Sequence, residues 1–190
     1  MDSERALEIA GGVQLIDIAE QLPKHPTKKQ KLRKKRAKWL FVHHNGVSAL
    51  DDKRNHIAWI ESMARFHVGK GWANIAYRFA IPYHGMDDGI IRVYRCLPWN
   101  AIGNHVRSLG GRCNRFGDSL VLQGNLNIHG LSSHQEEALE AFFPWYTGDF
   151  MAMHKTDISW HSDAARFGGI PKKACPGSNA KKWLNNYLSK

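Results

Sequence analysis

Histidine and cysteine side chains at the ends of apolar runs are the residues of this sequence best suited to chemistry. His43 closes the β-prone run 39–43, His161 closes a second short run, and Cys175 follows 14 positions later. Imidazole nitrogens and a thiolate sulfur are donors that zinc prefers, and three protein ligands leave a fourth position open for water. The sequence therefore predicts a His–His–Cys metal site assembled from distant segments.

Two alternatives remain open on the residues alone. His44 could take the place of His43, because adjacent strand residues point to opposite faces of a sheet and only one can face a given site. Cys175 lies among basic residues, which we expect to lower the pKa of its thiol, so it could instead act as a nucleophile. Cys96 and Cys113 are interpreted as structural or incidental thiols.

The elements that must position these residues alternate between strand and helix patterns. Short apolar runs predict strands, and apolar residues spaced three and four apart predict helices. Strands are expected over 39–44, 75–82, 90–94, 119–122 and 157–161, and helices over 53–67, from Ser133 and from Ser178. Ser133 and Glu136 are expected to form a capping box. The predicted fold is a single α/β domain, with a mixed central sheet of about five strands flanked by helices.

Residues 1–38 are expected to form an N-terminal extension to a domain over 39–190. The weakly amphipathic run Val13–Glu20 is followed by Pro23 and Pro26, and then by Lys28–Lys38, where eight of eleven residues are basic. The chain has 27 Lys and Arg against 17 Asp and Glu, a net charge of +10. Such a stretch is either a solvated loop or a binding site for a polyanion. No base-reading motif accompanies it, so nucleic acid is not the expected partner.

Composition excludes several classes of protein. A hydrophobic content of 43% and a charged content of 23% over 190 residues are typical of a soluble globular domain, not of a disordered chain. No stretch approaches the ~18 consecutive apolar residues of a membrane span. Residues 1–5 lack the features of a secretory signal, so we expect synthesis in a cytoplasm. Three cysteines do not form a disulfide framework.

Four motifs, taken in order, resemble the zinc-dependent N-acetylmuramoyl-L-alanine amidases, and most closely the endolysin-type amidases of phages. They are Phe-Val-His-His at 41–44, Gly-Trp-Ala-Asn-Ile-Ala-Tyr-Arg-Phe at 71–79, Asn-Ala-Ile-Gly-Asn-His at 100–105 and Lys-Ala-Cys-Pro-Gly at 173–177. The resemblance covers about residues 39–188. Four motifs in the correct order are more specific than any one of them. The resemblance implies the fold that this family shares with the peptidoglycan recognition proteins.

The resemblance also implies an activity, hydrolysis of the amide bond between N-acetylmuramic acid and the L-alanine of the peptidoglycan stem peptide. It places the zinc ligands at His43, His161 and Cys175. It places catalytic residues at Tyr77 and Lys173, and a histidine of the substrate groove at His105. A phenol and an ammonium aimed at the carbonyl oxygen would each stabilise the developing charge by roughly 2.7–4 kcal/mol.

This sequence departs from the family pattern in two places. Some branches carry a strand glutamate as general base, and the expected position here holds Val121. The segment 162–172, between the second histidine and the cysteine, is longer than expected and could form a lid or a specificity loop. The sequence therefore resembles the branch that uses tyrosine and lysine.

The expected protein is a monomeric, bacteriolytic phage-type endolysin that reaches the cell wall or periplasm after release by another factor. Lys28–Lys38 would bind anionic wall or outer-membrane polymers in a salt-dependent manner. A cytoplasmic amidase that recycles soluble muropeptides is one alternative. A peptidoglycan-binding module without catalysis is another.

Overall fold

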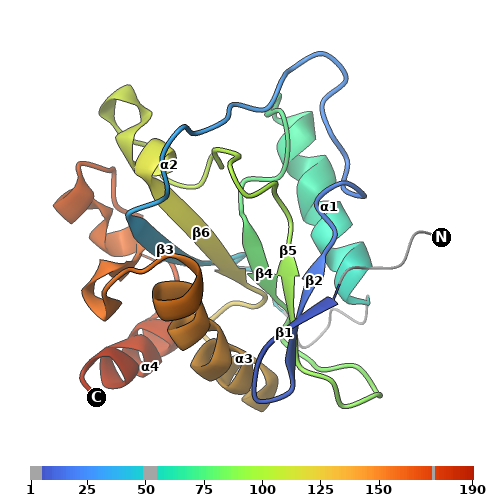
Figure 1. Ribbon diagram of the computed structural model, residues 1–190, viewed down its shortest axis with the longest axis vertical. Coiled ribbons are helices and arrows are strands. Elements are labelled where there is room, and N and C mark those ends of the chain that lie inside the picture. The colour runs from blue at the N-terminus through green and yellow to red at the C-terminus, as the bar shows by residue number, and fades with distance from the viewer. Residues whose placement is uncertain (1–5, 49–54, 173) are drawn as a thin grey trace.

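The computed structural model describes residues 6–48, 55–172 and 174–190, and within them a seven-stranded mixed sheet forms the centre of the molecule (Figure 1). The strand order is β1-β2-β5-β4-β6-β3-β7. Neighbours are parallel except for the antiparallel pairs β1–β2 and β4–β5. The strands are β1 (Ala6–Ala10), β2 (Val13–Asp17), β3 (Trp39–His44), β4 (Phe79–Ile81), β5 (Arg92–Arg95), β6 (Gly117–Leu122) and β7 (Ile158–Trp160).

Helices cover both faces of the sheet. They are α1 (His56–Gly69), α2 (Arg112–Phe116), α3 (Ser133–Pro144) and α4 (Ser178–Leu188), with a π-helical stretch at Trp145–Phe150 and 3₁₀ turns at Leu109–Gly111, Lys155–Asp157 and His161–Phe167. Leu120 and Leu122 of β6 pack with α3 and α4, whereas Val121 packs with α1. This alternation follows from the two-residue period of a strand. No helix in the described part of the chain is both long and apolar enough to cross a membrane.

Side-chain caps define where two of the helices begin. Asn55 caps α1, because its Oδ1 accepts a hydrogen bond from the backbone nitrogen of Ala58 at 2.7 Å. The helix expected from residue 53 therefore starts at His56, and Lys53 itself lies outside the described residues. The capping box of α3 is formed by Ser132 and Gln135, one residue earlier than expected. Two overlapping Ser-x-x-Gln/Glu patterns occur there, and the first one forms the cap.

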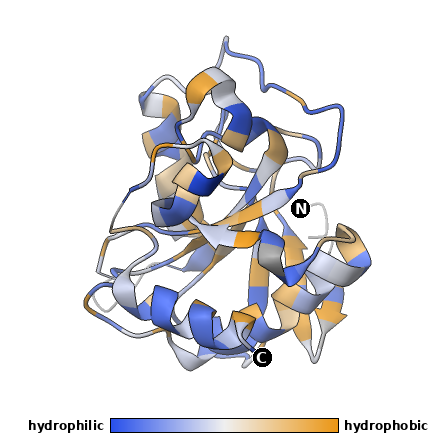
Figure 2. Cartoon of the chain, turned by 90° about the vertical axis from the view of Figure 1, so that its left-hand side faces the viewer, coloured by the Kyte–Doolittle hydropathy of each residue, from blue (hydrophilic) through white to orange (hydrophobic). Residues whose placement is uncertain are grey.

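The N-terminal part of the chain contributes β1 and β2 to the sheet, which raises the strand count from the expected five to seven. Gly11 and Gly12, with φ of +54° and +80°, form the turn between these two strands. Leu15 joins the core on the α3 side, and Ile16 and Ile18 join it on the α1 side. After β2 the chain crosses the top of the molecule to β3, and Figure 2 shows this loop as largely hydrophilic.

Candidate metal centre

His43, His161 and Cys175 converge at one point beside the sheet. One ligand atom from each of them lies within 4.8 Å of the other two. The Nδ1 atom of His43 lies 3.6 Å from the Sγ atom of Cys175, and the His43 and His161 ring centroids are 4.9 Å apart. His43 and Cys175 are buried and His161 is half-buried. Two imidazoles and one thiol at this spacing fit a single zinc ion.

Neighbouring strands and a closed loop explain this convergence. His43 lies on β3, and His161 directly follows β7, which pairs with β3 in parallel. The loop from His161 to Cys175 is closed by two backbone hydrogen bonds, from Ser162 to the Cys175 carbonyl (2.9 Å) and from Lys172 to the His161 carbonyl (3.3 Å). Residues far apart in the sequence are thereby held at one end of the sheet.

The structure distinguishes His43 from His44. The Nδ1 atom of His44 accepts a hydrogen bond from the backbone nitrogen of Leu126 at 3.1 Å, away from the three converging side chains. Burial lowers the pKa of His43 well below its usual range, and the neighbouring His105 and His161 lower it further. Burial, assisted by the charge of Lys172, lowers the pKa of His161 to about 4. Both rings are therefore neutral near pH 7, the form in which imidazole binds a metal.

The expectation that basic neighbours lower the pKa of the Cys175 thiol is wrong. Burial raises the pKa of Cys175 to about 11, although Lys172 and Lys181 act in the opposite direction. Desolvation of the thiolate outweighs the nearby charges because the side chain is only 3% exposed. Without a metal the thiol stays protonated near neutral pH, which disfavours Cys175 as a free nucleophile.

A cavity of about 580 Å³ adjoins the three side chains. It is lined by His43, His44, Asn45, Val47, Trp59, Ser62, Met63, Phe66, His67, Lys70, Trp72, Tyr77, Asn104, His105, His161, Lys172 and Cys175. No Asp or Glu of the described chain is among these residues, whereas two lysines are. The cavity therefore suits a polar, anionic ligand better than a cationic one.

Tyr77 lies beside the three candidate metal ligands, with its ring centroid 5.2 Å from that of His43. It precedes β4, so the strand expected over 75–82 is shorter than predicted and leaves Tyr77 outside it. Burial raises the pKa of Tyr77, so its hydroxyl keeps its proton and can donate a hydrogen bond. His67 also lines the cavity, although no motif in the sequence marks it; it accepts a hydrogen bond at Nδ1 from the backbone nitrogen of Ala76 (3.2 Å) and stacks on Trp72.

Solved structures with a similar fold include members of two groups of proteins. An endolysin N-acetylmuramoyl-L-alanine amidase, LysCS from Clostridium intestinale, is 21% identical over 92% of this chain and 95% of that one (TM-score 0.64). Drosophila PGRP-LB is 18% identical over 92% and 94% (TM-score 0.69). The Ph2119 endolysin of a Thermus scotoductus bacteriophage is 17% identical over 93% and 99% (TM-score 0.63). This chain has the amidase and peptidoglycan recognition protein fold. No protein-family model and no curated protein sequence matches it.

Val121 occupies the position at which the family resemblance implies a glutamate in some branches. Val121 pairs in register with His43 and is fully buried on the α1 side of the sheet. The segment 162–172 packs against the end of β3, where Phe167 contacts Trp39 and Phe41 at centroid distances of 4.9 and 5.2 Å. The backbone nitrogen of Ile170 donates to the Arg107 carbonyl at 2.7 Å. This long segment is therefore part of the packed domain.

The two remaining expected site residues differ in what the structure shows of them. Lys173 lies outside the described residues, and the lysines placed on the cavity wall are Lys70 and Lys172. His105 borders the same cavity but is only 6% exposed. The Nδ1 atom of its ring lies 3.2 Å from the Nε2 atom of His43, so the His105 ring contacts a candidate metal ligand.

Proposed function

We propose that this protein is a zinc-dependent amidase that cleaves the bond between N-acetylmuramic acid and L-alanine in peptidoglycan. The observation that carries the proposal is the convergence of His43, His161 and Cys175 at the wall of a 580 Å³ cavity. Tyr77 adds a protonated hydroxyl beside them. Similar folds in proteins named as N-acetylmuramoyl-L-alanine amidases support the substrate class.

The chain's own residues have distinct tasks in this reaction. A zinc ion held by His43, His161 and Cys175 would lower the pKa of a bound water to ~7 and polarise the substrate carbonyl. Neutral His43 and His161 keep a lone pair free for the metal. The Tyr77 hydroxyl donates a hydrogen bond to the carbonyl oxygen as negative charge develops there. We propose Lys173 as the second donor to that oxygen.

Two alternative functions are less well supported by the same residues. A module that only binds peptidoglycan has no need of two neutral histidines and a cysteine within 4.8 Å of one another. A cytoplasmic recycling amidase is disfavoured by the apolar Val121 and by the basic segment Lys28–Lys38. We therefore propose a phage-type endolysin that acts on the bacterial wall after release, as a monomer.

Digestion of purified sacculi followed by mass analysis tests this function. We expect products with an intact lactyl group and a new amino terminus at L-alanine. A chelator should abolish their formation, zinc should restore it, and a thiol-alkylating reagent should leave the zinc-loaded enzyme active. Cleavage of any other bond, or activity that survives chelation and is lost on alkylation, would contradict the proposal. A higher rate on released muropeptides than on intact sacculi would favour recycling.

We also propose that the basic segment Lys28–Lys38 binds anionic polymers of the wall or outer membrane. Lys34, Lys35 and Arg36 are exposed on it. Binding to sacculi should weaken strongly between ~0.05 and ~0.5 M salt, because screening shortens the range of the attraction. Replacing these three residues with glutamine should reduce binding at low salt. The control replaces three exposed lysines at other places, Lys155, Lys182 and Lys190. Equal loss in both triple variants would refute the segment's role.

A further inference from the structure

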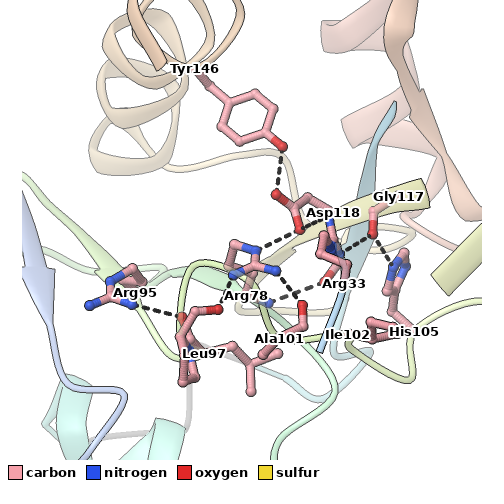
Figure 3. A network of polar contacts seen from close by, with 12 residues as sticks. Arg33, Arg78, Arg95, Leu97, Ala101, Ile102, His105, Gly117, Asp118 and Tyr146 are labelled. Carbon is pink, nitrogen blue, oxygen red and sulfur yellow. Dashed lines mark hydrogen bonds and ion pairs between the residues drawn. The ribbon is translucent and has the colours of Figure 1, made fainter. Parts of the chain in front are cut away.

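A buried chain of hydrogen bonds joins the candidate metal centre to the basic N-terminal segment. His43 directs Nδ1 toward Cys175 Sγ (3.6 Å) and its other nitrogen, Nε2, toward Nδ1 of His105 (3.2 Å). The Nε2 atom of His105 lies 3.3 Å from the carbonyl oxygen of Gly117. The same oxygen accepts a hydrogen bond from Arg33 Nη2 at 2.9 Å (Figure 3). Each ring nitrogen of His43 and His105 thus has a defined neighbour.

If Nδ1 of His43 binds the metal, the direction of every hydrogen bond in this series is fixed. A ring nitrogen that binds a metal carries no proton, so His43 must carry its proton on Nε2. That N–H donates to Nδ1 of His105, which must then be the unprotonated nitrogen of its own ring. The proton of His105 is therefore on Nε2 and is donated to the Gly117 carbonyl. A backbone carbonyl can only accept, so it fixes both tautomers.

We propose that His105 is a positioning residue that orients the metal ligand His43. We also propose that Arg33 of the N-terminal segment holds in place the Gly117 carbonyl, to which His105 donates its hydrogen bond. This inference depends on the metal centre of the proposed function. It gives His105 a task different from the contact with substrate that the family resemblance implies. Metal-bound histidines generally donate their second N–H to a fixed acceptor, which sets the orientation of the ring.

The packing around His105 supports a positioning role. The backbone nitrogens of His105 and Val106 both donate to the Oδ1 atom of Asn114, at 3.1 and 2.9 Å. The His105 ring stands at 87° to the His43 ring and contacts Phe41 at a centroid distance of 5.6 Å. With 6% of its surface exposed, His105 is held from several sides and offers little area to a substrate.

Arg33 differs from its basic neighbours because its side chain is buried, with 5% exposure. It pairs with Asp118 Oδ1 at 3.0 Å, and Asp118 also accepts hydrogen bonds from Arg78 Nε (2.5 Å) and the Tyr146 hydroxyl (2.8 Å) (Figure 3). Lys34, the next residue, is exposed. The segment thus contributes one buried guanidinium to the support of Gly117, while its exposed charges remain available to a polymer.

Zinc affinity, measured by competition with a chromophoric chelator, tests the role of His105 without any substrate. His105→Phe should raise the zinc Kd about 10- to 100-fold, the usual effect of removing a partner of a metal-bound histidine. His105→Gln should restore most of the affinity, because an amide can accept from His43 and donate to Gly117. The control is His134→Phe, an equally buried histidine at the start of α3, which should leave the Kd unchanged.

The outcomes separate this inference from the proposed function. If His105→Phe loses amidase activity while its zinc Kd is unchanged, His105 acts on substrate and the positioning role is overturned, although the amidase function stands. Should His105→Phe fail to fold, ring-nitrogen NMR of the zinc-loaded natural protein decides. Protons on Nε2 of both His43 and His105 are expected, and a proton on Nδ1 of His105 would overturn the inference.

Arg33 is tested in the same way against its exposed neighbour. Arg33→Met should raise the zinc Kd severalfold, less than His105→Phe does, because the Gly117 carbonyl keeps its hydrogen bond from His105. Lys34→Met removes the same charge from the same segment and should leave the zinc Kd unchanged. Equal effects of the two variants, or no effect of Arg33→Met, would overturn the role assigned to Arg33.

Discussion

Replacing Cys175 with serine is expected to remove bound zinc and to reduce amidase activity below detection. An alcohol is a far poorer zinc ligand than a thiolate, and the Cys175 Sγ atom is one of three candidate ligand atoms that lie within 4.8 Å of one another. The fold should survive, because serine differs from cysteine by one atom. Zinc content measured by elemental analysis, together with the rate on purified sacculi, checks the expectation.

The control for this variant is a second buried thiol. Cys96 is fully buried, and its Sγ atom lies 3.7 Å from the Tyr94 carbonyl, among core residues outside the cavity. Cys96→Ser should retain one zinc per chain and the amidase activity that goes with it. If Cys175→Ser keeps as much zinc as Cys96→Ser, then Cys175 is not a ligand and the metal centre must be assigned differently.

Replacing Tyr77 with phenylalanine is expected to leave zinc bound and to lower kcat about 10²- to 10³-fold. The substitution removes only the hydroxyl that donates to the developing charge on the carbonyl oxygen, and loss of one such donor has this usual magnitude. The ring packing against His43 and His67 should persist. KM should change little, because the donor acts more strongly in the transition state than on bound substrate. Steady-state kinetics on a soluble muropeptide, with zinc analysis, measures both quantities.

Tyr187→Phe is the matched control, since this tyrosine lies on α4 and is not part of the cavity wall. It should retain the natural kcat. Tyr77→Phe with an unchanged kcat would show that the hydroxyl has no part in the reaction. Loss of zinc from Tyr77→Phe would show instead that Tyr77 supports the metal centre.

The convergence of the histidines was predictable from strand patterns. His43 lies near the end of β3 and His161 directly follows β7, and residues at the same ends of neighbouring parallel strands lie close together at one edge of a sheet. The third residue, Cys175, does not end a strand, so its thiol chemistry and the motif around it, not a strand pattern, indicate its place. Its thiol pKa could not be predicted, because the nearby lysines are visible in the sequence while the burial that outweighs them is not.

The N-terminal strands and the buried network were harder to predict. β1 and β2 have five residues each and are separated by two glycines, so they do not show a long alternating pattern. Asp118 indicates that a buried polar network exists, because a carboxylate inside the apolar strand β6 requires buried partners. Arg33 carries no signal of its own among eight basic residues in eleven. The motif resemblance implied that His105 belongs to the site, but it did not indicate that the Nδ1 atom of its ring faces His43.

X-ray absorption at the zinc edge, on protein loaded with one equivalent of zinc, tests the metal centre most directly. The account predicts a four-coordinate ion with two imidazole nitrogens, one sulfur and one light-atom donor. A zinc environment without sulfur, or a chain that retains no zinc after desalting, would contradict it.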